Sequence, residues 1–255
     1  MRVWPIYKKE LRLYFTSPVA WVVLTLFVFI TGLFFVSIFS YFAQASMRVM
    51  ANPQMGRDLN VTDQVMRPLF DNMRVILLFV VPLVTMRLFA EERRSGTIEL
   101  LLTYPVRDGA VLAGKYLAAL TLFGVMLAAM LAYPAMIAYF ARVEPGPLAT
   151  GYLGLLLLGA MFLAIGVLAS SLTENQIVAA MVTFGILLSF WIVGWTSEFA
   201  GPRLAPILTH LSILEHNDTF AKGVLDTKDI IYYLDVTVLA LFLSHRSLES
   251  RRWNG

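Results

Sequence analysis

The sequence predicts an all-α fold, a polytopic membrane bundle of six transmembrane helices with an amphipathic surface helix at its N-terminus. Of its 255 residues, 58% are hydrophobic and only 15% are charged, which is too apolar for a soluble domain of this length. The charged residues gather in short clusters, and the uncharged stretches between them are mostly about 20 residues long, the length that crosses a bilayer. Lipid is therefore the expected solvent for most of the chain.

Residues 1–18 predict the surface helix. Basic residues such as Lys8 and Lys9 alternate there with aromatic ones such as Trp4, and Pro18 closes the segment. Aromatic rings in the headgroup layer and basic groups facing water are typical of a helix lying on a membrane. A frayed N-terminal tail is the alternative.

A cleaved secretory signal is a second reading of the N-terminus, because Ala43, Gln44 and Ala45 resemble a cleavage site. The preceding apolar run, 19–42, is longer than the ~7–15 residues of a signal peptide's apolar region. We therefore expect this run to be retained as the first span.

The remaining spans follow from the uncharged stretches, with Pro82 and Pro134 expected to kink two of them. The short connection between the third and fourth spans makes these two antiparallel neighbours, and the small residues of the fourth span let helix backbones approach closely. The six predicted spans are 19–42, 73–90, 111–140, 148–172, 177–196 and 229–246. The predicted loops are 91–108 on the cytoplasmic side, and 43–72 and 197–228 on the other side.

The last span has the shortest uncharged run and places Asp235 inside or near the membrane. An intramembrane carboxylate is a candidate polar site. A carboxylate near a helix end can also simply reach the interface, so both interpretations stay open. If 229–246 does not span, the bundle has five membrane helices.

Basic residues decide the predicted orientation. Roughly twelve of the 20 Lys and Arg fall on one side when the N-terminus, the loop 91–108, the turn at Thr173 and the C-terminus are placed together. The positive-inside rule then puts both termini in the cytoplasm, and we expect a multi-pass protein of a bacterial inner membrane.

Composition also excludes several classes of function. A net charge of +3, with no basic run interleaved with aromatics in the way that a groove for single-stranded nucleic acid needs, argues against a nucleic-acid partner. The absence of cysteine excludes disulfides and thiolate metal sites. Gly109 to Tyr116 nearly match a phosphate-binding loop, but Tyr116 cannot replace the Ser or Thr that holds magnesium, so we expect no ATP or other cofactor in this chain.

The most informative segment follows the second span, where a helix is expected to run on into the cytoplasm and break at Gly96. Thr97 can cap a short second helix that ends near Pro105. Its apolar face and surrounding charges suit a groove on another protein. An amphipathic loop helix resting on headgroups is the alternative.

This segment, Glu91-Glu-Arg-Arg-Ser-Gly-Thr-Ile-Glu-Leu-Leu-Leu102, with Pro105-Val106 and Gly114-Lys115, resembles the signature of ABC-2 type permeases. Within that group the chain looks most like the gliding-motility (Gld) type permeases and their relatives in nitrous oxide reductase maturation. Weaker similarity continues at Thr173 to Gln176, at His216, and near the C-terminus.

The resemblance implies a permease subunit with a coupling helix that contacts a separate ABC ATPase, which binds ATP and magnesium. It also implies a second permease copy in a homodimer and an extracytoplasmic Gld-type auxiliary subunit. The implied ATPase-coupling residues are Glu91, Glu92, Arg93, Arg94, Gly96, Thr97 and Glu99, with Glu174 and Asn175 forming a second cytoplasmic turn. Asp235 departs from the family pattern.

Two other classes of function stay open. An ATP-independent channel or secondary transporter needs paired ionisable groups at the midplane, whereas the spans offer only Asp235. A membrane-embedded enzyme can be drawn from His210, Glu215 and His216, although the His-Glu-x-x-His zinc pattern is absent. Within the favoured class, the almost uniformly apolar spans favour a hydrophobic cargo or a mechanical role.

Overall fold

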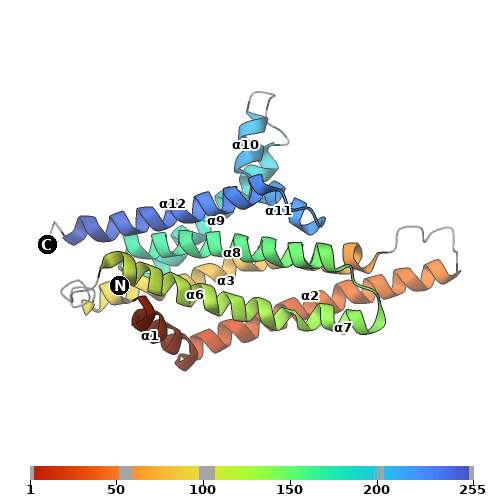
Figure 1. Cartoon of the computed structure of the whole chain (residues 1–255), viewed down its shortest axis with the longest axis horizontal. Coiled ribbons are helices and arrows are strands. Elements are labelled where there is room, and N and C mark those ends of the chain that lie inside the picture. The colour runs from red at the N-terminus through yellow and green to blue at the C-terminus, as the bar shows by residue number, and fades with distance from the viewer. Residues whose placement is uncertain are drawn as a thin grey trace.

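The computed structural model describes residues 3–51, 60–97, 107–197, 199, 201 and 204–252, and over these residues every regular element is a helix. Figure 1 shows the long helices running side by side, with the two ends of the chain at the same end of the bundle. This arrangement confirms the predicted all-α membrane bundle.

The helices are continuous with one another or joined by short connections. A π-helical turn, Thr62–Met66, precedes α3. The elements are α1 (Val3–Thr16), α2 (Pro18–Ala51), α3 (Arg67–Thr85), α4 (Arg87–Arg94), α6 (Asp108–Met130), α7 (Ala132–Phe140), α8 (Pro145–Leu172), α9 (Gln176–Ser197), α10 (Ala205–Leu211), α11 (Ile213–Ala221) and α12 (Thr227–Arg252).

Within the described part of the chain, five helical stretches are long and apolar enough to cross a membrane. They are Pro18–Val49, Thr62–Arg94, Asp108–Phe140, Pro145–Leu172 and Gln176–Thr196. The sixth predicted span corresponds to α12, which is long enough but is not among these five. The sixth crossing therefore stays a prediction.

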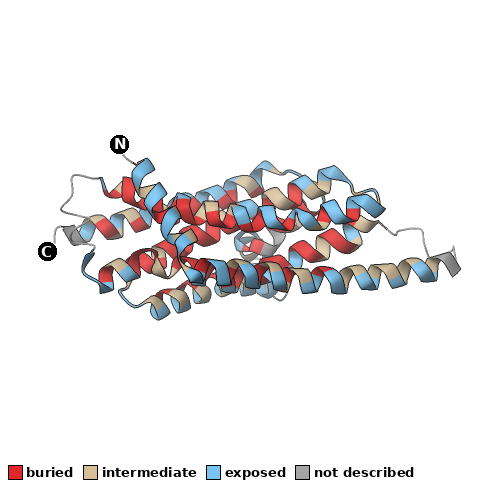
Figure 2. Ribbon diagram, turned by 90° about the horizontal axis from the view of Figure 1, so that it is seen from below, coloured by how far each residue is buried: buried red, intermediate tan, exposed pale blue. Residues whose placement is uncertain are grey.

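The segments predicted as loops 43–72 and 197–228 contain more helix than expected. Helix α2 continues to Ala51, and helical structure resumes at Val61. Figure 2 shows that this distal part of α2 extends past the bundle with few buried residues. In the second segment, Pro206 stands in the first turn of α10, where its missing N–H costs nothing, and so it begins a helix instead of breaking one.

The two prolines expected to kink spans lie near helix breaks. The chain turns at Leu131 between α6 and α7, three residues before Pro134, because a proline ring clashes with the preceding turn. Helix α3 instead continues through Pro82 and breaks at Met86. This second break leads directly into α4.

Helix α8 is buried along most of its second half, and its glycines explain how neighbouring helices reach it. An added Cβ at Gly159 would lie 2.1 Å from the ring of Phe123 on α6, and one at Gly166 would lie 2.2 Å from the hydroxyl of Thr85 on α3. The neighbouring helices therefore approach the α8 backbone itself, which confirms the packing role predicted for these small residues.

Helix α12 packs along α8 through one stripe, which includes Tyr233, Ala240, Ser244 and Leu248. Asp235 stands two residues after Tyr233, a rotation of about 200° around the helix, and its side chain is exposed. It therefore faces away from the bundle interior of this chain.

We expect Gly159→Ala to weaken the packing of α8 against α6, because the added methyl group collides with the buried Phe123 ring. Overpacking of this kind costs about 1–3 kcal/mol, so the thermal midpoint of the purified protein should fall. Gly185→Ala on α9 is the matched control, since nothing lies within 4 Å of its Cβ position. Equal midpoints for both variants would contradict the close contact.

Candidate functional site at the end of α4

Four segments that are distant in sequence meet at one end of the bundle. Figure 1 places α1, the end of α4 and the C-terminal end of α12 there. The turn after α8 joins them, because Ser247 on α12 donates a hydrogen bond to the carbonyl of Ser171 at 3.3 Å. These are the segments that the sequence assigned to a common side; that this side is cytoplasmic stays a prediction.

The helix break at Met86 is bridged by Ser170 from α8. The Ser170 hydroxyl donates to the Met86 carbonyl at 3.1 Å and accepts from the amides of Phe89 and Ala90 at 3.0 and 3.1 Å. The Phe89 amide is buried in the first turn of α4, where the leading N–H groups have no partner within the helix, so the Ser170 hydroxyl satisfies it from α8. The break is thus held in one geometry by α8.

Helix α4 ends where the sequence predicted. Gly96 has a φ of +69°, a left-handed conformation that favours glycine. Thr97 bonds backwards to the Glu92 carbonyl at 3.3 Å and contacts the Ser95 hydroxyl at 2.8 Å. Its hydroxyl therefore closes α4. The predicted second helix, including Glu99 and Pro105, lies outside the described residues.

The predicted ATPase-coupling residues divide into two groups. Glu91, Arg94, Gly96 and Thr97 are exposed at the tip of α4 and beyond it. Glu92 is largely covered and Arg93 is buried. Among the coupling residues that the structure describes, only the first group is exposed to a docking partner, and Glu99 lies outside the described residues.

Glu92 belongs to a buried ion cluster with Lys115 and Glu10. The Lys115 ammonium lies 2.9 Å from Glu92 and 3.1 Å from Glu10, and the Lys115 side chain is only 2% exposed. The ammonium also lies 5.3 Å from the centre of the Phe89 ring, a cation–π contact. One side chain of α6 thereby joins α1 and α4.

Gly114 explains how α1 approaches α6 closely enough for this pairing. A Cβ at Gly114 would lie 2.8 Å from Ile6, and the Tyr7 hydroxyl is 3.0 Å from that of Thr121. The Gly114-Lys115 pair, which nearly matches a phosphate-binding loop in sequence, therefore lies within helix α6. There Gly114 allows α1 to pack closely, and Lys115 forms an ion pair with Glu10 on α1.

Sequence reasoning missed this cluster. In the sequence Lys115 is conspicuous only in the Gly114-Lys115 pair of the false phosphate-loop match and of the family signature, and nothing singles out Glu10. The available signal was a lysine within the apolar third span, because a charge in such a place requires a partner.

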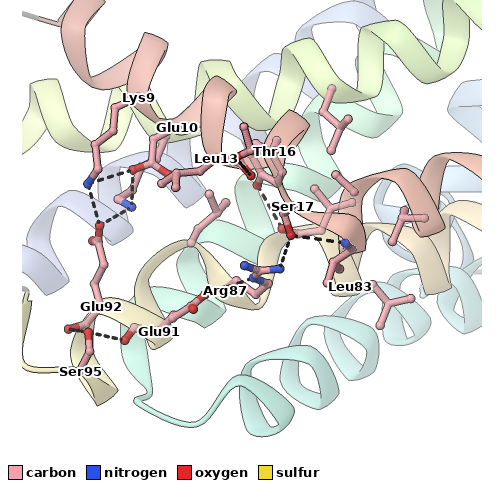
Figure 3. Close-up of a pocket in the computed structure, with 18 of the residues that line it drawn as sticks. Lys9, Glu10, Leu13, Thr16, Ser17, Leu83, Arg87, Glu91, Glu92 and Ser95 are labelled. Atoms are coloured by element: carbon pink, nitrogen blue, oxygen red, sulfur yellow. Dashed lines mark hydrogen bonds and ion pairs between the residues drawn. The ribbon is translucent and has the colours of Figure 1, made fainter.

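A cavity of about 460 Å³ opens between α1, α2, α3, α4 and α6. Figure 3 shows Lys9, Glu10, Arg87, Glu91 and Glu92 around it. Arg87 pairs with Glu91 at 3.1 Å and donates to the Ser17 hydroxyl at 3.3 Å. The remaining wall is mostly apolar and includes Val23 and Leu83. The cavity thus has a charged part and an apolar part.

Tyr14 lines the same cavity and ties α1 to α3. Its hydroxyl donates to the Val84 carbonyl at 3.1 Å. Burial, reinforced by the nearby Glu10 carboxylate, raises the pKa of Tyr14 well above its ordinary value of 10.0. The phenol therefore stays protonated and keeps donating throughout the physiological pH range.

The second predicted turn starts α9. The Asn175 side chain accepts hydrogen bonds from the amides of Ile177 and Val178 at 2.9 and 3.4 Å, as a helix N-cap does. Glu174 is exposed beside it. Asn175 therefore has a local structural task, and Glu174 is the residue of this turn that is presented outward.

The histidines considered for an enzyme lie far from this end, around α10 and α11. His216 is buried, with Nδ1 2.6 Å from Asp229 and Nε2 3.0 Å from the carbonyl of His210. Both ring nitrogens are thus engaged in hydrogen bonds that join α10, α11 and α12. Among the described residues no group of three His, Cys, Asp or Glu side chains is arranged to hold a metal ion.

A family model described as ABC-2 family transporter protein matches residues 4–247. No curated protein matches the chain. Since the family match covers nearly the whole sequence, the chain belongs to the ABC-2 family of transporter proteins and is a multi-pass membrane protein of the permease type.

Lys115→Met should strongly destabilise the bundle, because it leaves the Glu10 and Glu92 carboxylates facing each other with only the exposed Lys9 ammonium nearby, 3.8 Å from each. Removing one partner of a buried ion pair costs about 3–5 kcal/mol. The thermal midpoint in detergent should therefore fall. Adding Glu10→Gln and Glu92→Gln should restore much of the loss, and a triple variant as unstable as Lys115→Met would contradict the cluster's role.

Proposed function

We propose that this chain is the permease subunit of a bacterial ABC transporter, and that a separate ATPase binding ATP and magnesium drives it through the tip of α4. Membership of the ABC-2 family implies an ABC ATPase partner and a surrounding bilayer. The docking surface proposed here consists of Glu91, Arg94, Gly96 and Thr97, extended by Glu99, with Glu174 as a second contact.

The observation that carries this proposal is the way the tip of α4 is held. The ion pairs through Lys115 join it to α1 and α6, and the Ser170 hydroxyl joins its first turn to α8. A displacement applied at the exposed tip is therefore passed to three other helices and is not absorbed by a loop. A segment that only rested on headgroups would not need such fixing.

We further propose a homodimer of permease copies in the bacterial inner membrane, with both termini cytoplasmic and a Gld-type auxiliary subunit outside. The subtype rests on the sequence similarity to gliding-motility and nitrous-oxide-reductase maturation permeases. The apolar spans favour export of a hydrophobic cargo or mechanical work on an extracytoplasmic partner. An ATP-independent transporter finds less support, because Asp235 faces outward.

Glu91→Lys should weaken binding of the ATPase and its coupled activity while leaving the permease folded. The Glu91 side chain is 52% exposed, so reversing its charge acts mainly on binding of a partner. The substitution also removes the ion pair with Arg87, but a surface ion pair contributes little to the stability of the fold. Truncating or reversing a charge at an interface rim typically alters association and its salt dependence. Co-purification of the ATPase at two salt concentrations, together with ATP hydrolysis, measures the effect.

Glu144→Lys, at the other end of the bundle, is the matched control and should leave both readouts unchanged. Glu92 is unsuitable for this test, because its reversal also breaks the ion cluster. ATPase binding and activity unaltered in Glu91→Lys would overturn the docking assignment.

The proposed sidedness can be tested because the chain contains no cysteine. Ser95→Cys and Gly146→Cys place single thiols at exposed positions on opposite ends of the bundle. In intact cells a membrane-impermeant maleimide should label the thiol at 146 and spare the one at 95, and disruption of the cells should expose the latter. The reverse pattern would place the α4 tip outside, away from any ATPase.

A further inference from the structure

The cavity beneath α1 continues into a second, apolar hollow. A groove of about 320 Å³ runs between α2 and α3, lined by residues such as Phe27, Ile30, Phe79 and Val80. Val23 and Leu83 line both spaces, so the groove begins where the cavity ends. Together they form one site with a charged chamber and an apolar channel.

The length of the groove matches one leaflet of a bilayer. From Leu83 to Asn72 it follows 11 residues of α3, about 16 Å at ~1.5 Å per residue. Half of a ~30 Å hydrocarbon core is about 15 Å. An acyl chain lying beside α3 would therefore fill the groove while its headgroup stays in the chamber.

The charges of the chamber indicate which headgroup fits. Three cations and three anions line it, so its formal charge is zero and it suits a zwitterion. They are Lys9, Arg87, Lys115, Glu10, Glu91 and Glu92. An anionic headgroup would meet as much repulsion as attraction.

Two of these groups have unused hydrogen-bonding capacity. The Lys9 side chain is 58% exposed, and its ammonium lies 3.8 Å from its nearest carboxylate oxygens on Glu10 and Glu92, which is beyond hydrogen-bond distance. Among the described residues, the second carboxylate oxygen of Glu92, Oε2, is buried and accepts no hydrogen bond. Lys9 and Glu92 both line the chamber, so it offers a donor for an anion and, where a headgroup displaces the side chains that cover Oε2, an acceptor for a cation.

We propose that this site binds one phospholipid with a zwitterionic, primary-amine headgroup of the ethanolamine type. Its phosphate accepts from Lys9, its ammonium donates to Glu92, and one acyl chain occupies the groove between α2 and α3. A choline headgroup has no N–H to donate, so it leaves the buried Glu92 oxygen unsatisfied. The site lies in the leaflet next to α1 and α4.

Native mass spectrometry of the purified permease alone, titrated with lipids of identical acyl chains, tests this. One phosphatidylethanolamine should be retained at least about tenfold more tightly than phosphatidylcholine or phosphatidylglycerol, the factor for one charge-assisted hydrogen bond. Equal affinity for the ethanolamine and choline lipids, or preference for the anionic lipid, would overturn the headgroup assignment.

Leu83→Trp should fill the junction of chamber and groove and reduce retention of the ethanolamine lipid at least about tenfold. Leu117→Trp is its matched control, because Leu117 is 41% exposed, against 43% for Leu83, and lines neither space. The control should bind lipid as the native chain does. Identical retention in the two variants would overturn the site.

A second permease copy is the competing occupant of the groove, and Leu83→Cys distinguishes it in this cysteine-free chain. We expect the thiol to react with maleimide faster after delipidation and to form no disulfide-linked dimer in membranes. A dimer linked through this position would show that protein covers the groove. These measurements need no ATPase, so a negative result would contradict the lipid site without contradicting the proposed coupling.

Discussion

A buried ammonium between two carboxylates is the interaction on which this end of the molecule depends. An isolated charge in an apolar interior is expensive, so Lys115 can occupy the third span only while Glu10 and Glu92 come to it. Those partners belong to α1 and α4, which are more than 70 residues apart in the sequence. The requirement for neutralisation thus fixes the position of the surface helix relative to the helix that leaves the membrane.

Close packing around α8 provides the second half of the support. Gly166 lets Thr85 lie against the α8 backbone, and one turn later Ser170 supplies the hydrogen bonds that the broken helix lacks at Met86. Small side chains therefore do two tasks here. They bring helices close in lipid, where apolar area alone gives no preference for contact, and they make a defined break tolerable at membrane depth.

The sequence was informative wherever one local signal sufficed. Uncharged runs located the membrane helices, and Gly96 in its charged setting marked the end of α4, where a left-handed φ is indeed found. It was uninformative where the answer depended on distant partners. No residue close to Lys115 in the sequence indicates that Glu10 is its partner. The polar residues after Phe42 also give no sign that α2 continues to Ala51. Likewise the sequence leaves Asp235 open between an intramembrane polar site and a carboxylate that reaches the interface, and only the rotation of α12 shows that its side chain points outward.

The chamber and the ion cluster share walls, and this links the two proposals thermodynamically. Glu10, Glu92 and Lys115 line the chamber, so any movement of the α4 tip that shifts Glu92 also changes the space and charge offered to a headgroup. A lipid that binds more tightly to one position of α4 stabilises that position. A partner that moves α4 must then change the affinity for the lipid by the same factor by which the lipid changes the affinity for the partner. Lipid in the adjoining leaflet would in this way set the resting state against which the ATPase works.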